Sequence, residues 1–79
     1  MAAMITPTQF LRLQVRTELS DEDIAFVTGH TTRAVRGWRS GRNPVPLYVY
    51  MLMRAVEDKR LDVDWILAEV KTFNQQEAA

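Results

Sequence analysis

Apolar residues recur at helical spacing along most of this chain, and capping signals divide the pattern into separate helices. The segment Thr6-Pro7-Thr8-Gln9 begins the first helix, because it combines an N-cap threonine, a proline suited to the first helical position and a glutamine that can bond back to the cap. We expect this helix to run to about Glu18, with Phe10, Leu13 and Leu19 facing inward.

A very tight turn separates the second and third predicted helices. Ser20 can cap a second helix whose first turn is acidic, and Gly29 can take the left-handed conformation that ends it. Thr31 can then cap a third helix, over residues 32–40, only two residues after that glycine. The sequence therefore predicts two short helices that cross closely.

The fourth predicted helix is apolar on all sides. Pro46 can occupy its first position, and every residue from 47 to 56 except Arg54 is apolar. A helix of this kind is usually buried, yet a domain of this size can hardly surround one completely. We therefore expect part of it to face a second copy of the chain in a homodimer, together with Trp65 of the following helix.

A fifth helix follows from the apolar spacing after Asp62, which can cap it. Its inward residues recur to about residue 73, whereas residues 74–79 lack an apolar pattern and are expected to fray. The chain shows no strand alternation, internal repeat or low-complexity tract. The prediction is an all-α fold of five helices in one domain over residues 1–79, with its core at about residues 6–73.

Composition excludes several kinds of chemistry. The chain of 79 residues has no cysteine and one histidine, which excludes disulfides, thiolate metal sites and cysteine nucleophiles. It has no signal sequence and no apolar stretch long enough to span a membrane, so we expect a cytoplasmic protein without a membrane partner. Without a phosphate-binding glycine loop or spaced metal ligands, we expect no enzymatic activity, no metal and no cofactor.

The balanced net charge conceals a basic middle segment. Ten Lys and Arg residues balance ten Asp and Glu residues, so net charge alone does not indicate a nucleic-acid partner. Residues 28–56, however, contain five arginines and no acidic residue, and the acids lie before and after this segment. The charge distribution therefore singles out the third predicted helix and its surroundings.

A spaced pattern through the second and third predicted helices carries a family resemblance. It consists of Leu19-Ser20-Asp21-Glu22-Asp23-Ile24-Ala25, Thr28-Gly29-His30-Thr31, Val35, Trp38, Gly41 and Pro44-Val45-Pro46. The pattern covers about half of the chain and resembles the Cro/cI-type, or XRE-like, helix-turn-helix family of phage and bacterial repressors and antitoxins. The resemblance implies a lambda-repressor-like domain with its helix-turn-helix at residues 20–40 and with Ile24, Val35 and Trp38 in the core.

The resemblance also implies a function: sequence-specific binding of double-stranded DNA by a small transcriptional regulator, either a repressor or an antitoxin-like protein. The third helix would enter the major groove. The positions that match the family's usual DNA contacts are Thr32, Arg33, Arg36 and Gly37.

The spacing of residues on the third helix, taken without the family resemblance, indicates nearly the same set of exposed positions. It places Val35 and Trp38 on one side and Arg33, Arg36, Gly37 and Ser40 on the other. Arginine can bond guanine bidentately, so the first two arginines are the expected base readers. Gly37 would allow DNA to approach closely.

Phosphate contacts are expected at the two ends of the same helix. Thr31 and Thr32 can donate to a phosphate near the helix N-terminus. Arg39 and Arg42, at the flank and the exit, are the expected phosphate anchors.

Three positions depart from the family pattern. Asp21 stands where many members have a glutamine near a phosphate, and its charge would repel DNA unless it is turned away or neutralised. His30 replaces an apolar residue and is expected to be a half-buried packing residue, whereas Arg39 replaces a frequent glutamate and makes the helix more basic. Zero net charge and Asp21 support an alternative, a protein-interaction module that uses helices 47–56 and 62–73 on a partner protein.

Overall fold

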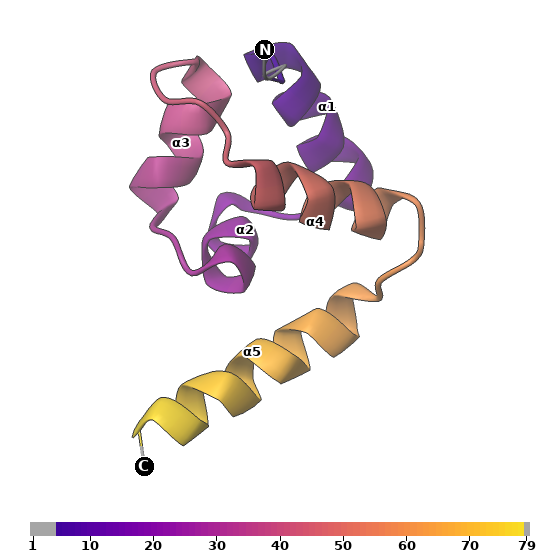
Figure 1. Cartoon of the computed structure of the whole chain (residues 1–79). Coiled ribbons are helices and arrows are strands. Elements are labelled where there is room, and N and C mark those ends of the chain that lie inside the picture. Colours follow the sequence, from indigo (N-terminus) through magenta and orange to yellow (C-terminus); the bar gives the residue numbers. More distant parts are fainter. Residues whose placement is uncertain (1–4, 79) are drawn as a thin grey trace.

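The computed structural model of the protein describes residues 5–78, which form α-helices joined by short loops (Figure 1). The helices are α1 (Pro7–Thr17), α2 (Asp21–Thr28), α3 (Thr32–Ser40), α4 (Leu47–Glu57) and α5 (Val63–Ala78). No strand occurs in residues 5–78, and the all-α class with five helices is confirmed. None of these helices is long and apolar enough to cross a membrane.

Local hydrogen bonds at the predicted caps begin α1, α2 and α3. The Thr6 hydroxyl accepts from the Gln9 amide at 3.1 Å, and the Gln9 side chain accepts from the Thr6 amide at 2.7 Å. Ser20 and Asp23 form a second capping box of the same kind, at 3.0 and 3.2 Å. The Thr31 hydroxyl accepts from an amide in the first turn of α3 at 3.1 Å. The predicted starts of these helices are therefore confirmed.

Residues in the left-handed conformation end the same three helices. They are Glu18 with φ 57°, Gly29 with φ 73° and Gly41 with φ 84°, each at the predicted end of its helix. Pro46 differs from the prediction, because its ψ of 145° is extended and makes it the N-cap of α4, not the first helical residue.

The last helix is longer than the sequence pattern predicts. It begins directly after Asp62 and remains helical to Ala78, so the expected fraying is wrong for residues 74–78, and residue 79 lies outside the described residues. This segment contains neither glycine nor proline, and its glutamine, glutamate and alanine residues are good helix formers. An exposed helix end needs no apolar pattern to continue.

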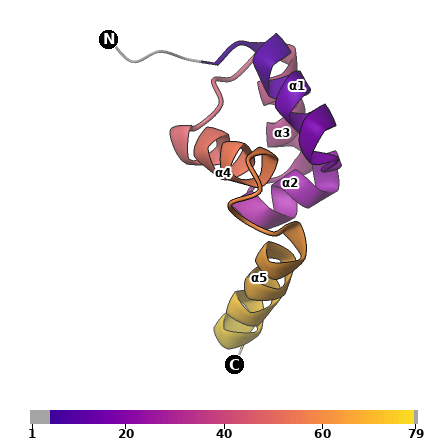
Figure 2. The same ribbon diagram turned by 90° about the vertical axis from the view of Figure 1, so that its right-hand side faces the viewer.

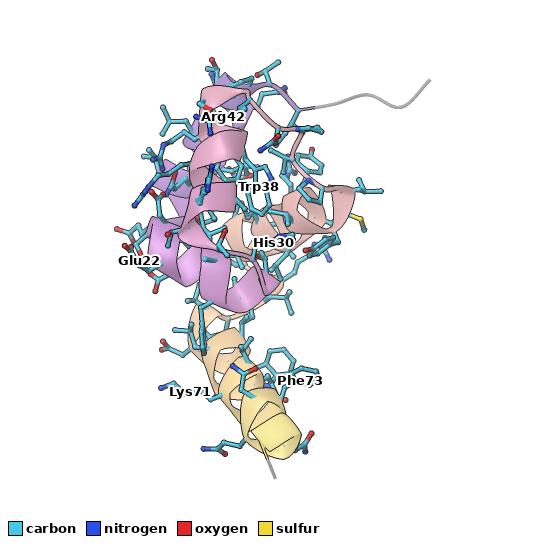
Figure 3. The ribbon with its side chains drawn as sticks, turned by 90° about the vertical axis from the view of Figure 1, so that its left-hand side faces the viewer. Glu22, His30, Trp38, Arg42, Lys71 and Phe73 are labelled. Atoms are coloured by element: carbon cyan, nitrogen blue, oxygen red, sulfur yellow. The ribbon has the colours of Figure 1, made fainter. Side chains whose placement is uncertain are left out.

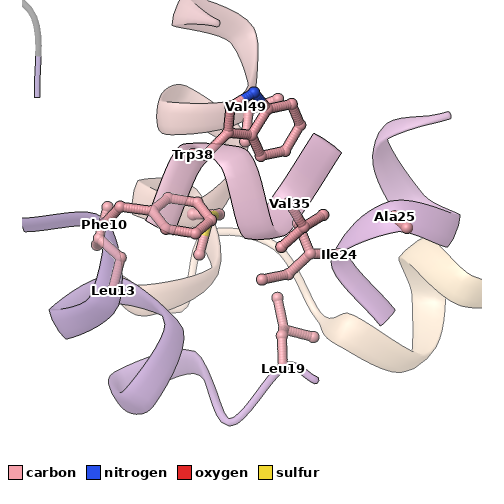
Figure 4. Packing of buried hydrophobic residues seen from close by; sticks show 9 residues of the cluster. Phe10, Leu13, Leu19, Ile24, Ala25, Val35, Trp38 and Val49 are labelled. Atoms are coloured by element: carbon pink, nitrogen blue, oxygen red, sulfur yellow. The ribbon is translucent and has the colours of Figure 1, made fainter. Parts of the chain in front are cut away.

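The core lies where α1, α2, α3 and α4 meet (Figure 4). All residues expected in the core from the first three helices are buried; they are Phe10, Leu13, Leu19, Ile24, Val35 and Trp38. The rings of Phe10 and Trp38 meet edge to face, with centroids 6.0 Å apart and an interplanar angle of 78°. This contact joins α1 to α3 and sets the rotation of α3 about its own axis.

Only one side of α4 is buried. Val49 and Met53 complete the core, whereas the opposite side leaves large apolar residues in solvent: Leu47, Tyr48 and Met51. The expectation that a small domain cannot surround this helix is confirmed.

The fifth helix contacts α2 and extends away from the other helices (Figures 1 and 2). It buries Ile66, but Trp65 and Phe73 remain exposed. Two helices therefore carry unpartnered apolar side chains at the surface of a single chain.

Replacement of the buried Trp38 tests this packing directly. We predict that Trp38→Ala lowers the free energy of unfolding by about 3 to 5 kcal/mol, because a large buried ring is replaced by a cavity. Trp65→Ala is the matched control: Trp65 is 56% exposed whereas Trp38 is 4% exposed, and its loss should cost under about 1 kcal/mol. Urea unfolding at low protein concentration measures both values. Equal stability of the two variants would contradict the orientation of α3.

Candidate functional site

The connection between α2 and α3 consists of residues 29–31 and is held by backbone geometry. Gly29 ends α2, and the amide of His30 donates to the carbonyl of Ala25 at 3.0 Å. A Cβ at Gly29 would meet no atom within 4 Å, so the positive φ alone requires glycine, not a lack of space. The turn therefore requires this glycine for its backbone conformation and not for close crossing of the two helices.

An aromatic cluster supports this turn from α4. The His30 ring meets Trp38 edge to face with centroids 4.9 Å apart, and it stacks on Tyr48 at 5.9 Å (Figure 3 labels His30 and Trp38). The Tyr48 hydroxyl donates to the carbonyl of Thr28 at 3.2 Å and also hydrogen-bonds Nε2 of His30. Because a hydroxyl has a single proton to give, the imidazole is the donor in the second bond.

His30 therefore acts as the expected packing residue, but it is exposed and not half-buried. Tyr48 was not identified by sequence reasoning, which treated it only as part of an apolar helix. The two residues are 18 positions apart, and no local pattern connects them.

The exposed side of α3 carries two of the expected DNA-contact arginines. Arg33 and Arg36 are exposed, opposite the buried Val35 and Trp38, as the helical spacing predicts. Arg42 is also exposed and follows the end of this helix, as Figure 3 shows. These three arginines form a basic ridge, a term we use below for Arg33, Arg36 and Arg42.

The hydroxyl residues at the two ends of α3 differ in exposure and in whether their hydroxyl proton is available to a ligand. Thr31 is exposed and uses its oxygen as an acceptor for the helix cap, which leaves its proton available to a ligand. Thr32 is half-buried. Ser40 is exposed, but its hydroxyl donates to the Gly37 carbonyl at 3.2 Å, so its proton is already in use.

Gly37 does not lie on the exposed side of α3, and the expectation that it does is wrong. It is buried, and a Cβ at this position would approach the side-chain amide nitrogen of Asn43 to 2.7 Å. The backbone N–H of Asn43 donates to the Gly37 carbonyl at 3.2 Å. The loop after α3 folds back over this glycine, which helical spacing alone could not reveal.

Arg39 is directed at Asp21 and not into open solvent. Its two terminal nitrogens bond the two carboxylate oxygens of Asp21, one pair at 3.0 Å. Gln14 of α1 joins them, since its amide donates to Asp21 at 2.8 Å and its oxygen accepts from Arg39 at 3.2 Å. Arg39 is thus not a free phosphate anchor, and Asp21 is neutralised by an arginine of α3.

This arrangement changes the acidity of both groups. The hydrogen bond from Arg39 is the largest effect and holds the pKa of Asp21 below its ordinary value, although burial acts in the opposite direction. The bond from Gln14 lowers the pKa further, by a smaller effect than burial. The hydrogen bond to Asp21 in turn raises the pKa of Arg39. Both shifts favour the charged pair.

The remaining arginine of the basic middle segment lies elsewhere. Arg54 of α4 lies 3.5 Å from Glu57, which also pairs with Arg16 of α1 at 3.2 Å. The contact with Arg16 joins α1 to α4, and neither contact contributes to the basic ridge.

Comparisons of the chain with protein families, with curated proteins and with solved structures found no match. Among the side chains that the structure describes, those of residues 5–76, no three histidines or carboxylates are grouped closely enough to hold a metal ion. The candidate site is therefore defined by its own geometry: the exposed side of α3, the turn before it and the Asp21 contact beside it.

Acid titration tests the Asp21 contact. The pKa of Asp21 is lower in the folded state than the ordinary 3.8, so its stabilising effect is complete above that value and is lost as the pH falls through the folded-state pKa. We predict that Asp21→Asn lowers the free energy of unfolding by about 1 to 3 kcal/mol near pH 7 and by less at low pH.

Glu22→Gln is the control for this titration. Glu22 is exposed in the same first turn of α2 and forms no ion pair with the described side chains of residues 5–76. Urea unfolding at several pH values measures both variants. A difference between wild type and Asp21→Asn that does not shrink in acid would show that the stabilisation is not ionic.

Proposed function

We propose that the protein is a sequence-specific DNA-binding regulator, a small repressor or an antitoxin-like protein. In this proposal α2, the turn and α3 act as a helix-turn-helix, and α3 enters the major groove of double-stranded DNA. One observation carries the proposal: α3 buries Val35 and Trp38 while its opposite side presents Arg33 and Arg36 to solvent. A short, capped helix with one exposed basic side has the form that the major groove accepts.

The proposal assigns different roles to the members of the basic ridge. Arg33 and Arg36 read bases, because a guanidinium can bond O6 and N7 of guanine together. Arg42, beyond the end of α3, neutralises a backbone phosphate. Thr31 donates its free hydroxyl proton to a phosphate near the helix N-terminus, where the helix dipole also favours an anion.

We further propose that the protein binds DNA as a homodimer. The exposed apolar side of α4 supports this, because Leu47 and Met51 lie one helical turn apart and Trp65 of α5 is also exposed. A twofold dimer would place two copies of α3 about one DNA turn apart, roughly 34 Å, on an inverted repeat.

The same exposed apolar residues favour a second candidate of a different class. If α4 and α5 dock on another protein, the domain is an interaction module and its basic ridge is only a solvated surface. DNA binding separates the two candidates, since an interaction module would not select a sequence from a pool of random duplexes.

The first test compares base readers with a phosphate anchor. After selection of a preferred site from random duplexes, Arg33→Ala and Arg36→Ala should each weaken binding to that site by about 1 to 3 kcal/mol and relax the preference at one base pair. Arg42→Ala should weaken binding to selected and scrambled duplexes alike and reduce the salt slope by about 0.9. Affinities on both duplexes at several salt concentrations give these values.

Thermal stability is the control for this test, and the affinities themselves supply the outcomes that would contradict the proposal. All three side chains are exposed, so the variants should retain the thermal stability of the wild type. Equal losses on both duplexes for all three variants would show that α3 does not read bases. No effect from any of them would favour the interaction module.

The second test addresses the dimer. Met51 is 60% exposed on α4, so Met51→Glu should leave folding intact but weaken self-association and, with it, binding to an inverted repeat. Sedimentation and binding to a single half-site are measured together, and half-site binding should not change. A wild-type protein that stays monomeric both free and on DNA would exclude the homodimer.

A further inference from the structure

We propose that Asp21 is a specificity-determining residue: its carboxylate withholds Arg39, and partly Arg36, from DNA phosphates, and so weakens binding to non-cognate sequences. The inference rests on the proposed function and deepens it. The negative charge of Asp21 lies beside Arg36, at the edge of the exposed side of α3 that is proposed to bind DNA. A negative charge at this place would by itself disfavour DNA binding.

The carboxylate is held firmly in place. Only 18% of the Asp21 side chain is exposed, and both of its oxygens accept from Arg39. Gln14 bonds both partners, so three helices fix the position of this pair. A carboxylate presents two oxygens to an arginine fork much as a phosphate does, and the Arg39 fork is therefore already occupied.

The two arginines beside Asp21 are held unequally. Arg39 is 34% exposed and bound through two nitrogens, whereas Arg36 is 65% exposed and only its Nε lies near Asp21 Oδ2, at 4.0 Å. Arg36 can leave this contact for a partner that offers better bonds. Arg39 would have to give up a bidentate pair and its bond to Gln14.

This inequality affects cognate and random DNA differently. On a cognate site, a bidentate bond to guanine compensates Arg36 for leaving Asp21. On random DNA only phosphates are available, and Asp21 keeps Arg39, and partly Arg36, from bonding them. Asp21 thus weakens non-specific binding more than specific binding, which increases the ratio between them.

The first arm of the test removes the charge of Asp21. Asp21→Asn retains the size of the side chain and can still bond Gln14. We expect it to strengthen binding to random duplex roughly three- to tenfold near physiological salt and to steepen the salt slope by about 0.9 for each arginine released. Binding to the selected site should increase less, so the specificity ratio falls.

Glu22→Gln is the matched control, since it removes one negative charge from the same turn of α2 without releasing an arginine. It should leave the salt slope unchanged. In the double variant Asp21→Asn with Arg39→Ala, the salt slope should be less steep than in Asp21→Asn alone, by the contribution of the one arginine that is missing.

The second arm does not depend on the folding of the Asp21 variant. In the otherwise wild-type protein, Arg39→Gln should leave the salt slope on random duplex unchanged, whereas Arg42→Ala should lower it by about 0.9. A lower slope for Arg39→Gln would show that Arg39 already contacts phosphate, and the inference would be wrong.

The outcomes separate the inference from the proposed function. If wild type binds DNA selectively but Asp21→Asn and Glu22→Gln behave alike, the inference alone is wrong, and Asp21 has only a structural role. If wild type binds neither selected nor random duplex, the proposed function is wrong and the inference is overturned with it.

Discussion

The position of α3 depends on the burial of one indole ring. Trp38 meets Phe10 of α1 and His30 of the preceding turn edge to face, and it belongs to a core that also contains residues of α2 and α4. Because this ring and Val35 are turned inward, Arg33 and Arg36 can only face solvent. The buried side of the helix thus determines which side is available to a partner.

The charge that the exposed side of α3 presents depends on the contact between Asp21 and Arg39, and cannot be read from the composition of the chain. Two departures from the family pattern, Asp21 and Arg39, bind each other, so the acid that would repel DNA and the extra base that would attract it neutralise one another. Under the proposed function, the available basic charge is the ridge of Arg33, Arg36 and Arg42. The zero net charge of the chain is therefore compatible with a DNA partner.

The second half of the molecule supports α3 from one side and leaves an apolar surface on the other. Tyr48 reaches the carbonyl of Thr28 and the ring of His30, so α4 stabilises the turn before α3. Leu47 and Met51 on the same helix remain exposed, and α5 extends away from the other helices. The helix that stabilises the turn is thus the same one that leaves Leu47 and Met51 exposed.

Local signals in the sequence determined the helices, whereas only the tertiary structure decided which side chains are free to act. Capping boxes and glycine stops operate within a few residues, so the ends of α1, α2 and α3 could be predicted, and helical spacing identified Val35 and Trp38 as core. The Asp21–Arg39 pair spans 18 positions, and the cover of Gly37 by Asn43 requires a loop to fold back. Such contacts arise from the angles at which helices cross and from the path of loops, and neither is encoded in the spacing of residues along one helix.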